Sequence, residues 1–189
     1  MMDTPQTSTQ TVLEHGISVH KYFNDLFQEL INGSELKFNW KLPQWLTDNK
    51  KFIVDNLHNY EIVKEYQLMH DCGKPYCMEI GFDGKRHFPD HAKKSHEIFS
   101  KISDNKIVAD LILKDMDLHL IKSDDVDSFV ENNSVETIIT LLVTALCELH
   151  SNAEMFGGID STSFKIKFKQ SDKRGKQILK LITKETILI

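Results

Sequence analysis

Apolar residues recur at helical spacing along most of the chain. Between Leu13 and Ile31 they stand three and four positions apart, and Asn32-Gly33 ends this segment, since glycine readily adopts a left-handed C-cap. The same spacing predicts helices over residues 45–52, 53–69, 90–102, 105–119 and 135–156. The last of these is apolar on nearly every side, so we expect it at the centre of a bundle. The pattern predicts a mainly α fold.

The pattern changes after Gly157-Gly158. Phe164, Ile166 and Phe168 alternate with lysines, and a period of two is typical of a strand with one wet face. Residues 172–175 read Asp-Lys-Arg-Gly and predict a turn, with a partner strand after it. We therefore predict a basic β-hairpin over residues 159–189, packed on a helical domain of residues 13–158.

The N-terminus is polar. Residues 1–12 offer little to bury and predict a disordered tail. They lack the basic start and apolar run of a signal peptide, and no stretch approaches the ~20 apolar residues of a membrane span. We expect a cytoplasmic protein without membrane contact, and 189 residues fit one domain with a small appendage.

Charge is unevenly distributed. Residues 164–189 contain eight Lys/Arg and two acids, a formal +6, which leaves −11 for the rest of a chain whose total is −5. An acidic body with a basic end argues against a dedicated duplex-DNA binder. The lysines have two interpretations: a solvated strand face, or a contact for a polyanion such as an RNA end.

Three cysteines stand at positions 72, 77 and 147. The number is odd, and the first two are five residues apart rather than at C-x-x-C spacing. We therefore expect three reduced thiols, in keeping with a reducing compartment.

The pair His70-Asp71 is the strongest candidate for chemistry. An imidazole and a carboxylate can bind one divalent ion together. Adjacent residues of a regular helix point about 100° apart, so both reach one ion only where the helix ends. Gly73 and Pro75 follow directly and predict such an end.

Three motifs, in order, resemble the HD superfamily of metal-dependent phosphohydrolases, and in particular the HD domains associated with tRNA nucleotidyltransferases. The string Met69-His70-Asp71-Cys72-Gly73-Lys74-Pro75 is similar to the superfamily signature. The stretch His87-Phe88-Pro89-Asp90-His91-Ala92-Lys93-Lys94-Ser95 resembles the segment that follows it. Glu14-His15-Gly16-Ile17-Ser18-Val19 is similar to the first-helix histidine motif. The resemblance covers residues 15–155 and implies an HD-type helical bundle.

The resemblance also implies roles. His15, His70 and Asp71 match metal ligands, Lys74 matches a lysine that meets a substrate phosphate, and His91 matches a residue for a second metal or the substrate. Relatives have an aspartate ligand on a late helix, and Glu148 stands at the matching position here. Many relatives also have a second histidine pair, where this chain has Asp115-Met116-Asp117-Leu118-His119. Asp115 or Asp117 can substitute for that pair. The implied metal is Mn, Fe, Co, Ni, Mg or Zn.

The implied reaction is the hydrolysis of a phosphomonoester or phosphodiester by a metal-activated water, and the implied substrate is a nucleotide or a nucleic acid. The implied catalytic residues are Asp71, Lys74 and His91. Asp71 or Asp115 would orient the water. A cyclic phosphodiesterase is a rival within the same chemistry. The alternative from another class is a catalytically weak or inactive HD module that binds nucleotide or RNA. One or two metals, the substrate and the oligomeric state stay open.

Overall fold

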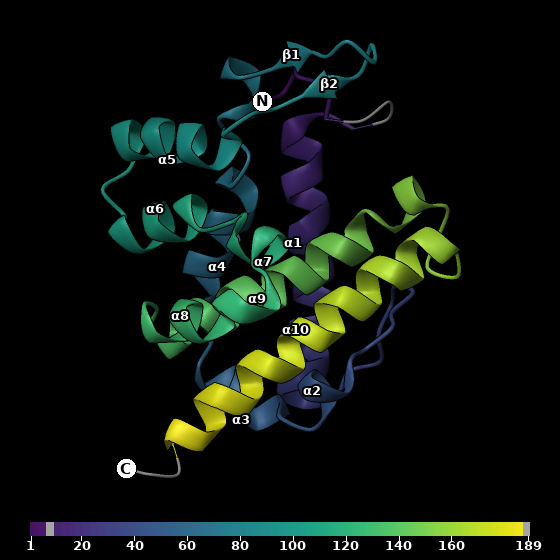
Figure 1. Cartoon of the computed structure of the whole chain (residues 1–189), viewed down its shortest axis with the longest axis vertical. Coiled ribbons are helices and arrows are strands. Elements are labelled where there is room, and N and C mark those ends of the chain that lie inside the picture. Colours follow the sequence, from purple (N-terminus) through teal and green to yellow (C-terminus); the bar gives the residue numbers. More distant parts are fainter. Residues whose placement is uncertain (7–9, 187–189) are drawn as a thin grey trace. The chain divides into compact units, whose positions relative to one another are not determined.

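The computed structural model describes residues 1–6 and 10–186, and it is mainly α-helical, as the sequence predicts (Figure 1). Its helices are α1 (Val12–Asn32), α2 (Gln44–Thr47), α3 (Lys50–Asp55), α4 (Tyr60–Met69), α5 (His91–Ile102), α6 (Lys106–Leu113), α7 (Asp117–Leu120), α8 (Val126–Glu131), α9 (Val135–Ser151) and α10 (Thr162–Thr186). Short 3-10 turns are η1 (Lys74–Tyr76), η2 (Ser123–Asp125) and η3 (Ala153–Phe156), and strands β1 (Glu79–Ile80) and β2 (Arg86–His87) pair antiparallel.

The chain divides into two compact units. Unit 1 comprises residues 1–20 and 59–117, and unit 2 comprises residues 21–58 and 118–189. Helix α1 is continuous and supplies its first half to unit 1 and its second half to unit 2. The predicted boundary at residue 158 falls inside unit 2, so the basic C-terminal segment belongs to the same unit as α9.

Unit 1 is built on helices α4, α5 and α6 together with the start of α1. Phe99 of α5 and Leu111 and Ile112 of α6 are fully or almost fully buried. Helix α1 runs very close to α4, because a Cβ at Gly16 would lie only 2.8 Å from the Gln67 carbonyl oxygen. Glycine at this position therefore allows the histidine beside it to approach the end of α4.

Unit 2 has α9 as its most buried helix, as expected for a helix that is apolar on nearly all sides. Eleven of its seventeen residues are buried, including threonines and His150. Ser134 caps its N-terminus by accepting from the Thr137 backbone N–H at 3.2 Å. Helix α10 buries Phe164, Ile178 and Ile182 in the same unit.

The predicted C-terminal β-hairpin is wrong. Residues 162–186 form one helix, α10, and residues 187–189 of the predicted hairpin lie outside the described residues. Ile166, which a strand would place on the apolar face with Phe164 and Phe168, is 54% exposed. Residues 164, 168, 175, 178, 179 and 182 instead share one helical face, and burial of that face favours the helix.

The N-terminal residues also differ from the predicted disordered tail. The Val12 backbone N–H donates to the Thr4 carbonyl at 2.8 Å, and Pro5 pairs with Thr11 in an isolated antiparallel bridge. The Gln6 side chain donates to Asp71 at 3.3 Å. Residues 7–9 of the predicted tail lie outside the described residues.

Residues 72–89 contain no α-helix and hold η1 and the short strands β1 and β2. Gly84 has a φ of 72° in the turn between β1 and β2, a conformation that glycine adopts without strain. Asp90 precedes α5 but does not cap it, because it has a left-handed φ of 51° and its side chain makes no cap hydrogen bond. No helix in the described part of the chain is both long enough and apolar enough to cross a bilayer.

Candidate metal centre

Asp71 lies at the centre of a buried group of polar side chains in unit 1. Its Oδ2 lies 2.6 Å from Lys74 Nζ, 3.3 Å from His70 Nε2 and 3.8 Å from His15 Nε2. Its Oδ1 lies 3.6 Å from His91 Nε2. The rings of His15 and His70 meet edge to face, with centroids 5.3 Å apart. The structure thus brings together five residues that the sequence places in the candidate site, although their roles stay predictions.

The end of α4 allows the adjacent side chains of His70 and Asp71 to approach each other. The His70 N–H still donates to the Tyr66 carbonyl, four residues back, whereas Cys72 and Lys74 donate to carbonyls only three residues back. The helix therefore tightens immediately after His70, as Gly73 and Pro75 predict. At this helix end Asp71 Oδ2 and His70 Nε2 lie 3.3 Å apart, although the two residues are adjacent in sequence.

Gly73 allows this turn to lie directly against α5. A Cβ at Gly73 would lie 2.3 Å from the Ser95 backbone nitrogen and 2.6 Å from the Lys94 carbonyl carbon. The Gly73 N–H donates to Ser95 Oγ at 2.8 Å. Because any larger residue would force the two segments apart, glycine is what keeps Asp71 close to His91, the first residue of α5.

Two histidines are oriented in the same way. His70 Nδ1 lies 2.8 Å from the Gln67 carbonyl oxygen, and His91 Nδ1 lies 3.0 Å from the Phe88 carbonyl oxygen. A carbonyl oxygen only accepts, so each Nδ1 carries a hydrogen. In the neutral ring Nε2 then holds a lone pair, and both Nε2 atoms face Asp71. Histidines that bind metal are commonly held by this arrangement.

The spacing of these atoms fits a shared ion. Ligands that bind a first-row metal at about 2.0–2.2 Å lie roughly 3 to 3.6 Å from one another. The His70 and His91 distances to Asp71 fall within this range, and the His15 distance of 3.8 Å is slightly above it. Asp71 Oδ1 is buried and accepts no hydrogen bond from the described residues. A bound divalent ion would satisfy this oxygen and the imidazole lone pairs together.

Asp71 is held as a carboxylate. Burial alone would raise the pKa of this acid, but nearby His70 and Lys74, with a smaller contribution from His15, hold its pKa well below the usual range. An ionised carboxylate is the form that binds a metal.

Lys74 is buried at the edge of the group. Its ammonium donates to Asp71 Oδ2 and lies 5.4 Å from the centre of the Phe88 ring. The resemblance to the HD superfamily implies that Lys74 meets a substrate phosphate. In the structure its positive charge compensates the Asp71 carboxylate. A lysine at this position can donate hydrogen bonds to that carboxylate and to a bound anion.

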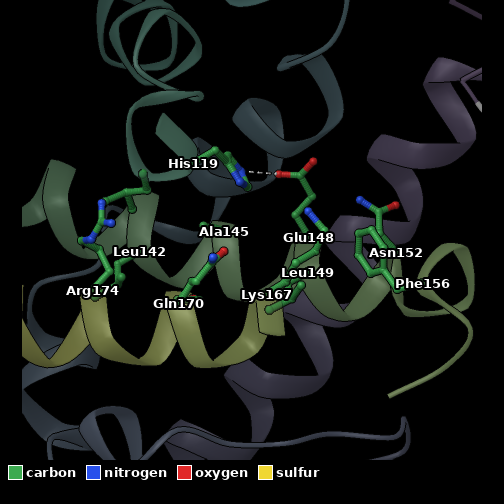
Figure 2. A pocket seen from close by; sticks show the side chains of 12 residues that line it. His119, Leu142, Ala145, Glu148, Leu149, Asn152, Phe156, Lys167, Gln170 and Arg174 are labelled. Carbon is green, nitrogen blue, oxygen red and sulfur yellow. Dashed lines mark hydrogen bonds and ion pairs between the residues drawn. The ribbon is translucent and has the colours of Figure 1, made fainter. Parts of the chain in front are cut away.

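Two further predicted ligands have other partners. Asp115 belongs to unit 1 and accepts from the Tyr66 hydroxyl at 2.5 Å; the Tyr66 ring lies 6.3 Å from the His70 ring. Glu148 lies on α9 in unit 2, 3.1 Å from His119 Nε2 (Figure 2). The ligand roles of Asp115 and Glu148 stay predictions of the sequence.

Three residues near the site escape prediction from the sequence. Gln6 lies in the segment expected to be disordered, Ser95 fixes the turn at Gly73, and Phe88 packs against the Lys74 ammonium. Ser95 and Phe88 fall inside the quoted motif, and their spacing from His91 could have drawn attention to them. Nothing in the sequence around Gln6 points to Asp71.

Comparisons of the chain with protein-family models, curated proteins and solved structures find no match. The resemblance to the HD superfamily therefore rests on the three motifs alone, and the site is judged by its geometry.

Proposed function

We propose that unit 1 binds a divalent metal ion through His15, His70 and Asp71 and hydrolyses a phosphate ester. The observation that carries the proposal is the pair of imidazoles on Asp71. Each has its Nδ1 hydrogen on a backbone carbonyl and its Nε2 directed at the same buried carboxylate. Without a proton or a cation between them, a lone pair and a carboxylate at this distance repel each other.

The residues divide the work of hydrolysis as follows. A bound divalent ion would supply a water whose pKa falls from 15.7 toward about 7, and a positive charge for the phosphoryl oxygens. Asp71 holds negative charge in a buried place and can orient that water. Lys74 and His91 lie beside Asp71 and can meet the non-bridging oxygens of the phosphate, where negative charge grows in the transition state.

We propose a nucleotide or a nucleic-acid phosphate ester as the substrate, on the resemblance to HD domains alone. The second candidate is a module that binds nucleotide or RNA without turnover. It is favoured by Glu148 and Asp115, where the chain departs from the usual ligand pattern. A purely structural role is the third, because a buried Asp-Lys pair with protonated histidines needs no metal.

Metal analysis of purified protein separates these possibilities. We expect the wild type to retain close to one equivalent of Mn, Co, Ni or a similar ion, and His70→Ala and Asp71→Ala to lose it. His87→Ala is the matched control, because this exposed histidine pairs only with Asp83 among the contacts described. Each protein is then assayed with nucleoside monophosphates, cyclic nucleotides and an aryl phosphodiester.

Turnover in the wild type and in His87→Ala, together with its loss in the other two variants, supports the phosphohydrolase. Stoichiometric metal with no turnover on the panel favours the binding module. A wild type that binds no metal at micromolar concentration overturns the proposal.

A further inference from the structure

Large apolar side chains are exposed on the β1–β2 hairpin of unit 1, residues 76–88, whose turn extends away from α5 (Figure 1). Tyr76 and Ile80 are 70% and 66% exposed, and Met78 is 43% exposed. Phe82 is fully exposed. We call these four residues the apolar patch. They fall within seven consecutive residues, whereas the exposed hydrophobic residues of most soluble proteins are scattered singly, so the patch indicates a surface for a partner.

The residues of the apolar patch are spaced to lie on one side of the hairpin. Met78 and Ile80 stand at alternate positions along β1, so they point to the same face, and Phe82 continues this spacing into the turn. Arg86 pairs with Ile80 across the hairpin and shares that face. Glu79 points to the opposite face. The patch therefore has one apolar side with a charged residue at its border.

The hairpin that carries the patch has a closed turn and an anchored base. The Gly81 N–H donates to the Lys85 carbonyl at 2.9 Å, and the Gly84 N–H donates to the Gly81 carbonyl at 2.9 Å. At the base, the Phe88 ring centre lies 5.4 Å from Lys74 Nζ. A surface that is already ordered loses less conformational entropy on association than a loose loop does.

The area of the patch is close to what a small dimer needs. Covering the two aromatic rings and the side chains of Met78 and Ile80 would bury roughly 500 Å² on each copy of the chain. Two copies would then bury about 1,000 Å² together, which is the lower limit for a specific interface. No additional surface is required for a weak dimer.

The charges of the hairpin favour a second copy of the chain over a nucleic acid or an anionic membrane. The hairpin carries two acids, Glu79 and Asp83, and two cations, Lys85 and Arg86, so its formal charge is zero. Surfaces that bind nucleic acids or anionic lipids are strongly basic. A second copy brings equal numbers of both signs, and a two-fold arrangement lets the acids of one copy approach the cations of the other.

We propose that two copies of the chain associate through the apolar patch, face to face about a two-fold axis. In such an interface the same residues of both copies meet. Ile80 is the middle of residues 78–82, so the axis passes near it. The inference goes beyond the proposed function, because it requires neither metal nor turnover.

Sedimentation equilibrium of the full chain in EDTA measures the association. The chain has a mass of 21.9 kDa, and a dimer has twice this mass. We expect a dimer with a dissociation constant in the micromolar range, as a small interface implies. Ile80→Ser and Phe82→Ser should each raise this constant at least ten-fold, and circular dichroism checks that each variant is folded.

Ile102→Ser is the matched control. Ile102 is also 66% exposed and belongs to unit 1, but it lies at the end of α5 and outside the hairpin. This variant loses the same exposed apolar side chain as Ile80→Ser does. It should change the dissociation constant less than two-fold.

Chemical crosslinking with a short bis-maleimide tests the two-fold arrangement. Cys77→Ser serves as the background, because Cys77 is the half-buried thiol of the hairpin while Cys72 and Cys147 are buried. In this background Ile80→Cys should give a crosslinked dimer. Glu79→Cys, on the opposite face, should give at least ten-fold less.

A chain that stays monomeric at millimolar concentration overturns the inference. So does equal weakening of the dimer by Ile80→Ser and Ile102→Ser, which would indicate non-specific association. Flotation of a monomeric chain with vesicles of phosphatidylcholine and phosphatidylserine would overturn it as well and assign the patch to a membrane surface. Because no step involves a metal, His70→Ala should dimerise as the wild type does even if it abolishes hydrolysis.

Discussion

At the scale of single residues, Asp71 connects stability to the candidate chemistry. Its side chain and that of Lys74 are 2% and 9% exposed, and their charged atoms lie 2.6 Å apart. Two buried charges are costly to remove from water, and their attraction only partly offsets that cost. The pair is therefore a weak source of stability as a whole, but each member depends strongly on the other.

Asp71→Asn should destabilise the fold strongly, because it leaves the Lys74 ammonium buried without its counter-charge. We expect a loss of about 3–5 kcal/mol in the free energy of unfolding, measured by urea denaturation in EDTA. The double variant Asp71→Asn/Lys74→Met should recover much of this loss, since it removes the uncompensated charge. If the double variant is as unstable as the single one, the ion pair is not the cause.

His150 in unit 2 provides a second prediction at this scale, for pH. It accepts from the Lys41 backbone N–H at 3.1 Å through Nε2, its Nδ1 donates to the Leu146 carbonyl at 2.8 Å, and its ring packs against Trp40 with centroids 4.5 Å apart. Burial lowers the pKa of this imidazole below its ordinary value. The unfolded chain therefore takes up this proton at a higher pH than the folded chain does.

Stability should accordingly be full above the ordinary histidine pKa of about 6.5 and fall as the pH drops below it. His150→Gln removes this titrating group, so its free energy of unfolding, measured by urea denaturation, should fall less than that of the wild type between about pH 7.5 and pH 5.5. The difference should be no more than ~1.4 kcal/mol per pH unit. His87→Gln, at an exposed site, should follow the wild type. Parallel curves for wild type and His150→Gln would contradict the prediction.

At the scale of elements, α10 shows where the pattern misleads. Six residues, Phe-Lys-Ile-Lys-Phe-Lys, alternate as a strand would, and Asp172 to Gly175 resembles a turn. The alternation is too short to distinguish a strand from a helix, because residues 164 and 168 are also four apart and can share one helical face. Over residues 164–182 the helical period accounts for more buried positions, and it leaves Ile166 exposed. The clearest wrong prediction concerns Gly175, which was expected in a turn and lies within α10.

Gly175 makes room for Trp45 of α2. A Cβ there would lie 2.4 Å from Trp45 Nε1 and 2.5 Å from Cε2, and Trp45 is 3% exposed. Gly175→Ala gains about 1 kcal/mol of helix propensity but overpacks the ring, which typically costs about 1–3 kcal/mol. We expect a lower melting temperature, although the helix is a better one.

Lys176→Ala, at the next and exposed position, is the control and should change stability by less than about 0.5 kcal/mol. Trp45→Phe in the Gly175→Ala background should recover part of the loss, because the smaller ring leaves space. A more stable Gly175→Ala would show that Trp45 can move at little cost.

The candidate site is more predictable than the C-terminal helix for a physical reason. His70, Asp71, Gly73 and Lys74 are close in sequence, so a helix end alone brings them together. His91 joins them because Gly73 lets α5 approach, and the motif includes that glycine. Gln6 could not be predicted, since its contact with Asp71 spans 65 residues and has no periodic pattern behind it.

At the scale of the whole molecule, the residues of the proposed metal centre can be assigned to one of the two units. His15, His70, Asp71, Lys74 and His91 all belong to unit 1. Helix α1 belongs to both, so the two units share one continuous backbone element. A metal ion bound among these five residues should therefore stabilise unit 1.

Hydrogen exchange measured by mass spectrometry can follow this stabilisation by the metal ion. A ligand at 100 times its Kd stabilises the folded state by about 2.7 kcal/mol, which is enough to slow exchange around its site. We expect Mn²⁺ to protect amides near residues 12–20 and 66–77 in the wild type but not in His70→Ala. Protection of Glu148 by Mn²⁺ as well would support it as the late ligand. Protection limited to unit 1 would remove Glu148 from the ligand set, and Mn²⁺ protection that persists in His70→Ala would contradict the proposed metal centre.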